Sequence, residues 1–368
     1  NGLEKRPKLR FPGFDEPWSI YKAEELFKNV ADKNHPMETV LTIIQGKGTL
    51  PREQAGRNIH YDDASLANYK KVEQGDFIIH LRSFEGGLEM ANEDGIVSPA
   101  YTILRCMKPH SSLFYEAYFH TDEFINHILS KSVEGIRDGR QISYEAFKWL
   151  GLPYCDLSEQ ERIAQLFCTL SHRIEKQQQM VDALKKYKRG LIKLVFEKVM
   201  SEAHYQLPLS DLCISISSGR TTVNESNGRY PLFGSTGIVG MTNTIEHDGD
   251  IVMVARVGAN AGKVNFFSGR CGVTDNTLVI RVKENTIHPK FLAYFLENFD
   301  LHKLIFGSGQ PLVTGGQLKK IQSPVIAYKA QLLITRSLES LDRIIGTQDT
   351  YMEKLIQLKS GLMQRLFI

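Results

Sequence analysis

The sequence has 368 residues and a formal net charge of +3, with 42% hydrophobic and 24% charged residues. This composition supports two modest hydrophobic cores, and no apolar run is long enough to span a membrane. It excludes a strongly basic body that holds nucleic acid by charge alone. The five cysteines lack the paired spacing of a zinc site or a disulfide framework, which predicts a cytoplasmic location and no bound metal.

The first globular segment covers residues 1–157. It opens on an extended arm and a short helix predicted from Ala23 to Asn29. The glycine-rich polar stretch 45–57 that follows is typical of a loop. Further along, the patterns predict strands over 76–82 and 100–105 and helices over 112–129 and 144–150, and Pro153 then ends the unit.

Residues 158–200 carry the pattern of a long helix. Apolar residues alternate every four and three positions, as in the seam of a coiled coil. The seam consists of Ile163, Phe167, Leu170, Ile174, Gln177, Val181, Leu184, Lys188, Leu191 and Val195.

The same pattern returns 171 residues later, in segment 328–368. Its ten positions are Ile334, Leu338, Leu341, Ile345, Gln348, Met352, Leu355, Lys359, Leu362 and Leu366. Two amphipathic helices share leucines by chance, but here the Gln and Lys interruptions recur in register as well. We therefore infer an internal duplication.

The second globular segment, residues 201–327, repeats the element order of the first. Strands are predicted over 249–256 and 277–281, and a helix over 291–296. The predicted fold class is α+β, with two mixed globular domains in a tandem pseudo-twofold repeat. The two long helices separate the domains and are expected to pack as an antiparallel coiled coil, with Gln177 and Gln348 paired near its middle.

Two stretches resemble nucleotide or methyl-donor loops without matching them. In 258–264 the glycine spacing is one residue short of a phosphate loop, and Val264 occupies the place of the magnesium-binding hydroxyl. The glycine turn 233–237 follows no hydrophobic strand. Motifs for adenine methylation, zinc proteolysis and nuclease chemistry are absent, so we predict no catalytic residues and no metal ligands.

Polar residues in glycine-rich loops are the remaining candidates for function. Arg and Lys match guanine acceptors, Asn and Gln match adenine, and each of them is also an ordinary surface residue. Arg82 and Arg256 stand out because they follow matching strands. The candidate DNA-binding residues are Lys47, Arg52, Arg57, Arg82, Arg137, Arg140 and Gln141 in the first segment, and Arg220, Thr221, Thr222, Arg229, Arg256, Asn260, Lys263 and Gln310 in the second.

Together these features resemble the specificity subunit of a type I restriction-modification system. The resemblance covers nearly the whole chain and rests on the duplicated architecture and on several stretches. These are residues 7–12, 80–87, 95–101, 159–164, 218–220, 230–235 and 307–311.

The resemblance implies two target recognition domains that each read one half of a split, asymmetric double-stranded DNA sequence, with the helices fixing the spacer. It also implies partners: two modification (methyltransferase) subunits, which use S-adenosylmethionine, and restriction subunits. This chain itself would bind no cofactor. The second helix departs from the family pattern because it lacks the acidic first turn of the first helix.

Two other functions fit the sequence. The chain could be a non-DNA scaffold whose coiled coil spaces two protein-binding heads, or a fragment of a single-chain modification or restriction enzyme. Within the family, an inactive or phase-variable allele also fits. Changing Arg82 or Arg256 to Ala distinguishes the scaffold, because only a DNA-reading protein loses recognition of a half-site.

Overall fold

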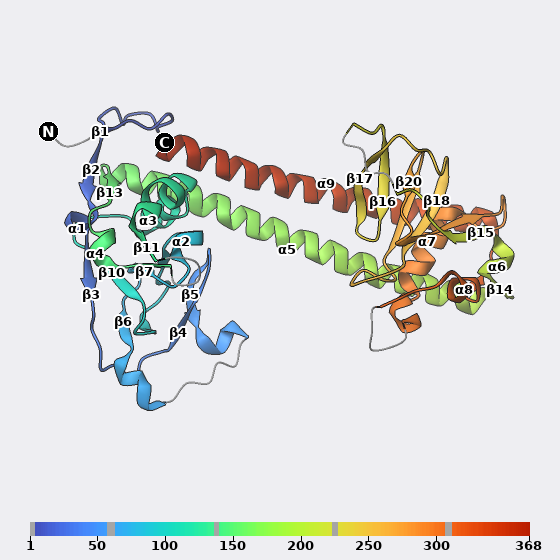
Figure 1. The fold of residues 1–368 in the computed structure, drawn as a ribbon, viewed down its shortest axis with the longest axis horizontal. Helices are drawn as coiled ribbons and strands as arrows, with labels where there is room; N and C mark the ends of the chain where they lie inside the picture. The colour runs from blue at the N-terminus through green and yellow to red at the C-terminus, as the bar shows by residue number, and fades with distance from the viewer. Residues whose placement is uncertain (1–3, 57–62, 136–139, 223–226, 306–310) are drawn as a thin grey trace. The chain divides into compact units, whose positions relative to one another are not determined.

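The computed structural model describes residues 4–56, 63–135, 140–222, 227–305 and 311–368 (Figure 1). The chain forms two compact units. Unit 1 comprises residues 1–178 and 351–368, and unit 2 comprises residues 179–350. Each unit therefore contains about half of each long helix.

The long helices are α5 (Leu157–Glu202, 46 residues) and α9 (Tyr328–Phe367, 40 residues). All twenty predicted seam positions are buried or half-buried. In unit 1, Ser171 and Arg173 of α5 contact Lys359 and Tyr351 of α9, so partner numbers fall as α5 advances. In unit 2, α5 and α9 meet through Lys188 and Asp342 at 2.8 Å.

The antiparallel packing of the helices is thus confirmed within unit 1, where the contacts give their direction. Gln177 is 9% exposed. Its pairing with Gln348 stays a prediction.

The first turns of α5 and α9 are fixed by equivalent glutamines. Gln160 Oε1 accepts the amide of Ser111 at 3.0 Å, and Gln331 Oε1 accepts the amide of His288 at 2.8 Å. The helix starts differ one turn earlier. Asp156 Oδ1 accepts the amide of Ser158 at 2.9 Å, whereas the equivalent residue in α9 is alanine. The second helix therefore lacks this side-chain cap.

Unit 1 is built around an antiparallel sheet in the order β3-β10-β7-β8. Its strands are β3 (Phe27–Val30), β7 (Phe77–Ile79), β8 (Glu89–Met90) and β10 (Thr102–Cys106). Smaller sheets contain β1 (Glu4–Lys5), β2 (Trp18–Lys22) and β13 (Gly151–Tyr154), β4 (Leu41–Ile44) and β5 (Gly48–Pro51), β6 (Lys70–Val72) and β9 (Gly95–Val97), and β11 (Val133–Glu134) and β12 (Gln141–Ile142). The helices are α1 (Ala23–Leu26), η1 (Arg52–Ala55), η2 (Asp63–Asn68), α2 (Ser83–Gly86), α3 (Ser112–Phe119), η3 (Glu123–Ile128), η4 (Leu129–Ser132) and α4 (Tyr144–Phe147).

Unit 2 contains a sheet of the same design, in the order β15-β21-β18-β19. Its strands are β15 (Cys213–Ser218), β18 (Asp250–Ala255), β19 (Val264–Ser268) and β21 (Thr277–Val282). Two further sheets contain β14 (Gln206–Pro208) and β22 (Gln322–Pro324), and β16 (Tyr230–Gly234), β17 (Gly237–Thr242) and β20 (Gly272–Val273). The helices are α6 (Leu209–Leu212), α7 (Pro289–Asn298), η6 (Leu301–Leu304) and α8 (Gly315–Lys319).

The predicted duplication is confirmed by packing as well as by strand order. In unit 2, Phe196 of α5 contacts Phe291 and Phe295 of α7 at 5.2 and 5.7 Å between ring centroids. In unit 1, Phe367 of α9 contacts Phe114 and Tyr118 of α3 at 5.3 and 5.5 Å. Phe367 also stacks on Phe167 and touches Trp18, so the last turn of α9 completes the core of unit 1.

Four local predictions were wrong. The helix expected over 23–29 ends at Leu26, and the chain continues as β3. The helix expected over 112–129 is divided into α3 and η3 near Thr121, whose hydroxyl donates to the carbonyl of Tyr118. Within the stretch 45–57, which was predicted as a loop, residues 48–51 form β5 and residues 52–55 form η1. Pro153 lies within β13, at the edge of its sheet, where its missing N–H costs no ladder bond.

No helix among the described residues is long and apolar enough to cross a membrane.

Candidate nucleic-acid interface

In unit 1 the tip of the β4–β5 hairpin presents Lys47 to solvent on a fixed backbone. Glu89 Oε1 accepts the amide of Gly46 at 2.7 Å, and Oε2 accepts the amide of Gly48 at 2.9 Å. The carbonyl of Lys47 accepts the Asn92 side-chain amide at 2.8 Å. Glu89 and Asn92 therefore fix the backbone on both sides of Lys47, while the Lys47 side chain remains exposed.

Gly48 has no substitute at this tip. Its φ is +75°, a left-handed conformation, and a Cβ atom there would lie 2.5 Å from the carbonyl oxygen of Met90. Any larger residue would push the hairpin away from the strand that holds it. The glycine at position 48 thus allows the backbone of the hairpin to approach the backbone of β8 closely.

Glu89 is fully buried, so its charge depends on its donors. Burial raises the pKa of Glu89, but hydrogen bonds from His120, Gly46 and Gly48 outweigh burial and leave the pKa below its ordinary value. His120 Nε2 lies 3.3 Å from Glu89, and Nδ1 lies 2.8 Å from the carbonyl of Glu116. Both neighbours are acceptors, so they favour the doubly protonated ring. Although burial lowers the pKa of His120, these acceptors raise it above its ordinary value.

Other candidates of unit 1 lie on elements that adjoin this hairpin. Arg82 is exposed and immediately precedes α2, and Gly86 of α2 packs so closely on Gln45 that a Cβ would overlap its amide. Arg140 lies over the ring of Phe84, 4.2 Å from its centroid. Gln141 follows in β12, which contacts α2. The structure therefore brings the elements that carry Lys47, Arg82, Arg140 and Gln141 together.

Arg52 has a different environment. It begins η1, at the far end of β5 from Lys47, and its half-buried guanidinium lies 5.8 Å from the centroid of the Tyr69 ring. Arg57 and Arg137 lie outside the described residues. For all three, DNA contact stays a prediction.

In unit 2 a second carboxylate holds the loop that follows β15. Glu246 accepts the amide of Arg220 at 2.9 Å through Oε1, and the amide and hydroxyl of Thr221 at 3.1 and 2.6 Å through Oε2. Burial raises the pKa of Glu246, but these donors outweigh it and lower the pKa. The side chains of Arg220 and Thr222 are exposed.

Thr221 itself is only 4% exposed. The Thr221 hydroxyl donates its hydrogen bond to Glu246. Thr221 therefore helps to position the loop and has no donor left for solvent. This corrects the grouping of Thr221 with residues that reach outward. Arg229 is exposed, ahead of β16.

A third candidate loop closes the β18–β19 hairpin. Arg256 is half-buried, and its amide and carbonyl are bonded to Asn276 and Val313. Asn260 is half-buried and Lys263 exposed, and the Lys263 amide donates to the Asn260 carbonyl at 2.9 Å. The stretch joins two antiparallel strands rather than a strand and a helix, so it is not a phosphate loop. Gln310 lies outside the described residues.

Sequence reasoning missed Glu89 and Glu246. A single glutamate carries no recognisable motif, and each acquires its role only when the fold delivers several amides to it. Apart from the adjacent glycines at Gly46 and Gly48, no local signal indicated either residue.

The cysteines carry no disulfide, and two of the buried ones are held in the thiol form. All five cysteines are free thiols. Burial raises the pKa of Cys213 and of Cys271 to about 11, which keeps both protonated near neutral pH. Within the described ranges, no three His, Cys, Asp or Glu residues are grouped so as to hold a metal ion.

Parts of the chain are similar in sequence to known proteins. Residues 206–355 match the model of the type I restriction modification DNA specificity domain. The chain is 28% identical over 123 residues to the type I restriction enzyme EcoprrI specificity subunit of Escherichia coli, covering 33% of this chain and 30% of that protein. It is 28% identical over 156 residues to the MjaVIII specificity subunit of Methanocaldococcus jannaschii, covering 39% and 36%. The alignments thus span about a third of each of these relatives.

Solved structures match along the whole chain. The S subunit of a type I restriction-modification system from M. genitalium has a TM-score of 0.65 at 14% identity, with 98% of this chain and 99% of that chain covered. The HsdS subunit from Thermoanaerobacter tengcongensis has a TM-score of 0.50 at 15% identity, with 99% and 98% covered. These likenesses establish a shared fold.

Proposed function

We propose that the chain is a specificity subunit of a type I restriction-modification system, that it recognises a bipartite DNA sequence and that each unit reads one half. The observation that carries this proposal is a pair of loops fixed by carboxylates, of which Glu89 is buried and Glu246 half-buried. Both units have the same sheet, yet unit 1 presents Lys47 through Glu89 and unit 2 presents Arg220 through Glu246.

The fixed loops suit direct readout of base edges. A lysine or arginine can donate to the O6 and N7 acceptors of guanine, and a glutamine can pair with adenine. Side chains on a preorganised backbone lose less entropy on binding than side chains on a mobile loop. Since the two loop sets differ in residues and in anchoring, the two half-sites are expected to differ, which gives an asymmetric target.

We further propose that the helix pair sets the distance between the two halves. It would also dock two modification subunits, and restriction subunits would join the complete complex. S-adenosylmethionine would bind to the modification subunits, and this chain would contribute no catalytic step and hold no cofactor. The proposed complex acts on double-stranded DNA in the cytoplasm.

A map of methylated adenines across the native host genome, with this gene intact and deleted, tests the proposal. Loss of one split, asymmetric motif on deletion is the expected result, and it would also provide the target sequence. If the map does not change, co-purification decides between a silent system and a different function. Failure to co-purify with a methyltransferase subunit would favour a scaffold that does not read DNA.

A further inference from the structure

The two long helices carry a lysine at the same repeat position, but the surroundings of these lysines differ. In unit 2, Lys188 Nζ lies 2.8 Å from Asp342 and 3.3 Å from Glu297. Its Nζ also lies 5.3 Å from the centroid of the Tyr294 ring, whose hydroxyl donates to Asp342 at 2.5 Å. The charge of Lys188 is thus balanced within its own unit, and an aromatic ring covers it.

Lys359 of unit 1 has lost all three of these partners. The helix offset and the matching aromatic contacts of α3 and α7 identify the replacements. They are Ser171 for Asp342, Ala117 for Tyr294 and His120 for Glu297. Lys359 Nζ donates to Ser171 Oγ at 2.8 Å, in the place of the Lys188–Asp342 ion pair.

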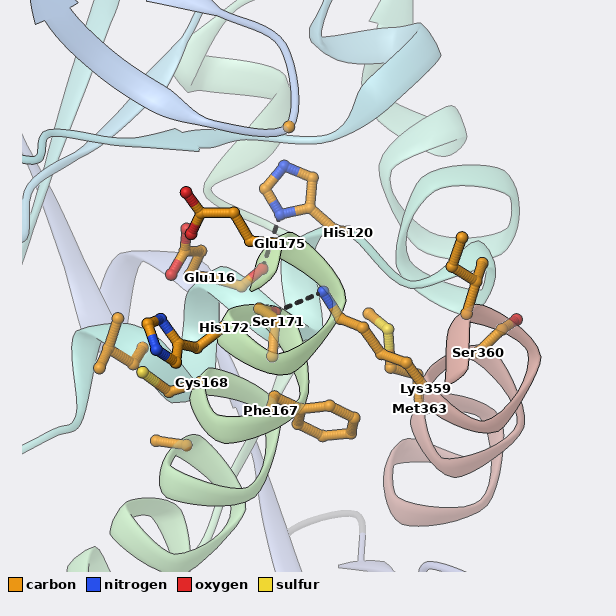
Figure 2. Close-up of a pocket in the computed structure, with 15 residues that line it drawn as sticks. Glu116, His120, Phe167, Cys168, Ser171, His172, Glu175, Lys359, Ser360 and Met363 are labelled. Atoms are coloured by element: carbon orange, nitrogen blue, oxygen red, sulfur yellow. Dashed lines mark hydrogen bonds between the residues drawn. The ribbon is translucent and has the colours of Figure 1, made fainter. Parts of the chain in front are cut away.

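A pocket of about 670 Å³ lies between α3, α5 and α9 of unit 1, where Ala117 and Ser171 are smaller than their counterparts in unit 2 (Figure 2). Its apolar walls include Leu113, Phe167, Ile356 and Met363. Leu113 is 41% and Ile356 48% exposed, so apolar surface remains uncovered at the pocket. The volume is typical of small-molecule sites.

The charged groups around the pocket do not supply the missing ion pair. Among the described residues, no carboxylate oxygen lies within 4.0 Å of Lys359 Nζ. Glu116 attracts Lys359 only at longer range, and burial raises the pKa of this carboxyl. His120 is engaged by Glu89, while His172 and Glu175 line the pocket beside Glu116 (Figure 2).

We propose that this pocket binds an aromatic carboxylate. The carboxylate would accept hydrogen bonds from Lys359 Nζ and from the Ser171 hydroxyl, which keeps a free proton while it accepts from Lys359. The ring would contact Phe167, Ile356 and Met363, and so restore to unit 1 the ring and the acid that Tyr294 and Asp342 provide in unit 2.

The surrounding charges favour a carboxylate over a phosphate. Glu116 lines the pocket, and a second negative charge on the ligand would be repelled by it. A singly charged acid needs only the one cation that the pocket leaves without an ion-pair partner. Such a group can belong to a free organic acid or to the acidic and aromatic side chains of a bound partner.

The test is a titration of the full chain with 4-hydroxyphenylacetate, followed through the methyl NMR signal of Met363. We expect saturable shifts with a dissociation constant on the order of 1 mM. 4-Methylphenol, which lacks the carboxylate, should bind much more weakly. Lys359→Met should weaken binding by about tenfold or more, because a charged hydrogen bond is lost. Lys354→Met, which changes an exposed lysine of the same helix, should leave binding unchanged.

A second variant imports the residues of unit 2 into unit 1. Ala117→Tyr combined with Ser171→Asp should fill the pocket, raise the unfolding temperature and abolish probe binding. Equal binding of the probe to the wild type and to Lys359→Met, or no saturable shift in the wild type, would overturn the proposal. Adding the modification subunit then separates the two sources. Displacement of the probe indicates a partner's carboxylate, and retained binding indicates a free acid.

Discussion

Glu246 Oε2 lies 2.6 Å from the hydroxyl of Thr221, and Oε1 lies 2.9 Å from the amide of Arg220. One carboxylate therefore satisfies several donors of a loop that has no regular secondary structure. Without this acceptor the loop would exchange these bonds for water and its backbone would become mobile. The direction of the Arg220 side chain thus depends on a residue that is distant in sequence.

We predict that Glu246→Gln mobilises this loop and weakens DNA binding. The side-chain NH2 of the introduced glutamine would face backbone and hydroxyl groups that are themselves donors. This should cost about 1 to 3 kcal/mol of stability. Faster hydrogen exchange at Arg220 and Thr221 is the direct measurement. Asp248→Asn is the matched control, because Asp248 forms an ion pair with exposed Arg270 and not with the loop amides of Arg220 and Thr221. Equal exchange rates in the two variants would contradict the role of Glu246.

The stability of unit 1 should fall both at acidic pH and at alkaline pH. The pKa of Glu89 lies below its ordinary value of 4.5, so its contribution is complete above that pH and is lost as the pH falls through the folded value. The pKa of His120 lies above 6.5, so its contribution is complete below pH 6.5 and is lost as the pH rises through the folded value. We therefore expect this pair to stabilise the unit most between pH 4.5 and 6.5.

Urea unfolding measured from below pH 4.5 to well above pH 6.5 checks the prediction. In His120→Gln the decline on the alkaline side should flatten, because the group that titrates there is gone. His127→Gln, at an exposed histidine, should keep the wild-type profile. An unchanged profile in His120→Gln would show that the decline has another origin.

Arg82→Ala and Arg256→Ala should each weaken recognition of a different half-site. Loss of one base contact costs about 1 to 3 kcal/mol of binding free energy. Competition with DNA in which one half of the target is scrambled measures the effect on each half. Arg343→Ala, on an exposed position of α9, is the control. If both substitutions affected the same half, the assignment of one half to each unit would be wrong.

Gln160→Leu and Gln331→Leu should destabilise the protein by similar amounts. Each removes the acceptor for one loop amide, of Ser111 or His288, at a cost of about 1 to 3 kcal/mol. The two sites share no partner, so the free energies of unfolding in the double variant should be additive. Chemical denaturation of the four proteins tests this, and a large non-additive term would show that the helix starts are coupled.

Shortening both helices by seven residues should shorten the spacer of the DNA target. Deleting residues 177–183 and 348–354 keeps the seam in phase and removes about 10 Å of helix. At about 3.4 Å per base pair this corresponds to about three base pairs. The map of methylated adenines reports the new spacing. A target of unchanged spacing in an active complex would refute the proposed role of the helix pair as a ruler.

The helices were predictable because their signal is periodic and long. Ten seam positions constrain one face of a helix, and all of them proved buried or half-buried. The β4–β5 hairpin was not predictable in this way. Its tip is polar and rich in glycine, and its anchor, Glu89, is some forty positions away along the chain. Local patterns report local periodicity, and they do not report bonds that form only after the sheet has brought distant segments together.

In the candidate site, too, some features were predictable from local sequence and others depend on distant residues. The exposed residues Lys47, Arg82 and Arg220 were recognisable by residue type and by their position in loops. Thr221 has the same local appearance, yet its hydroxyl is turned inward to Glu246. Whether a side chain faces solvent depends on acceptors supplied by other strands, and no single stretch of sequence contains that information.

The position of Phe367 in the core of unit 1 has a consequence for biosynthesis. The ribosome completes the first 178 residues of this unit early, but the helical turn that packs on Trp18, Phe114 and Phe167 is translated only after all of unit 2. Until the end of α9 has been translated, nascent unit 1 therefore exposes the aromatic side chains that Phe367 covers in the complete protein. A chain whose translation stops after unit 2 would leave that surface exposed to chaperones and proteases. Truncated mRNAs should therefore yield no stable protein that recognises one half of the target.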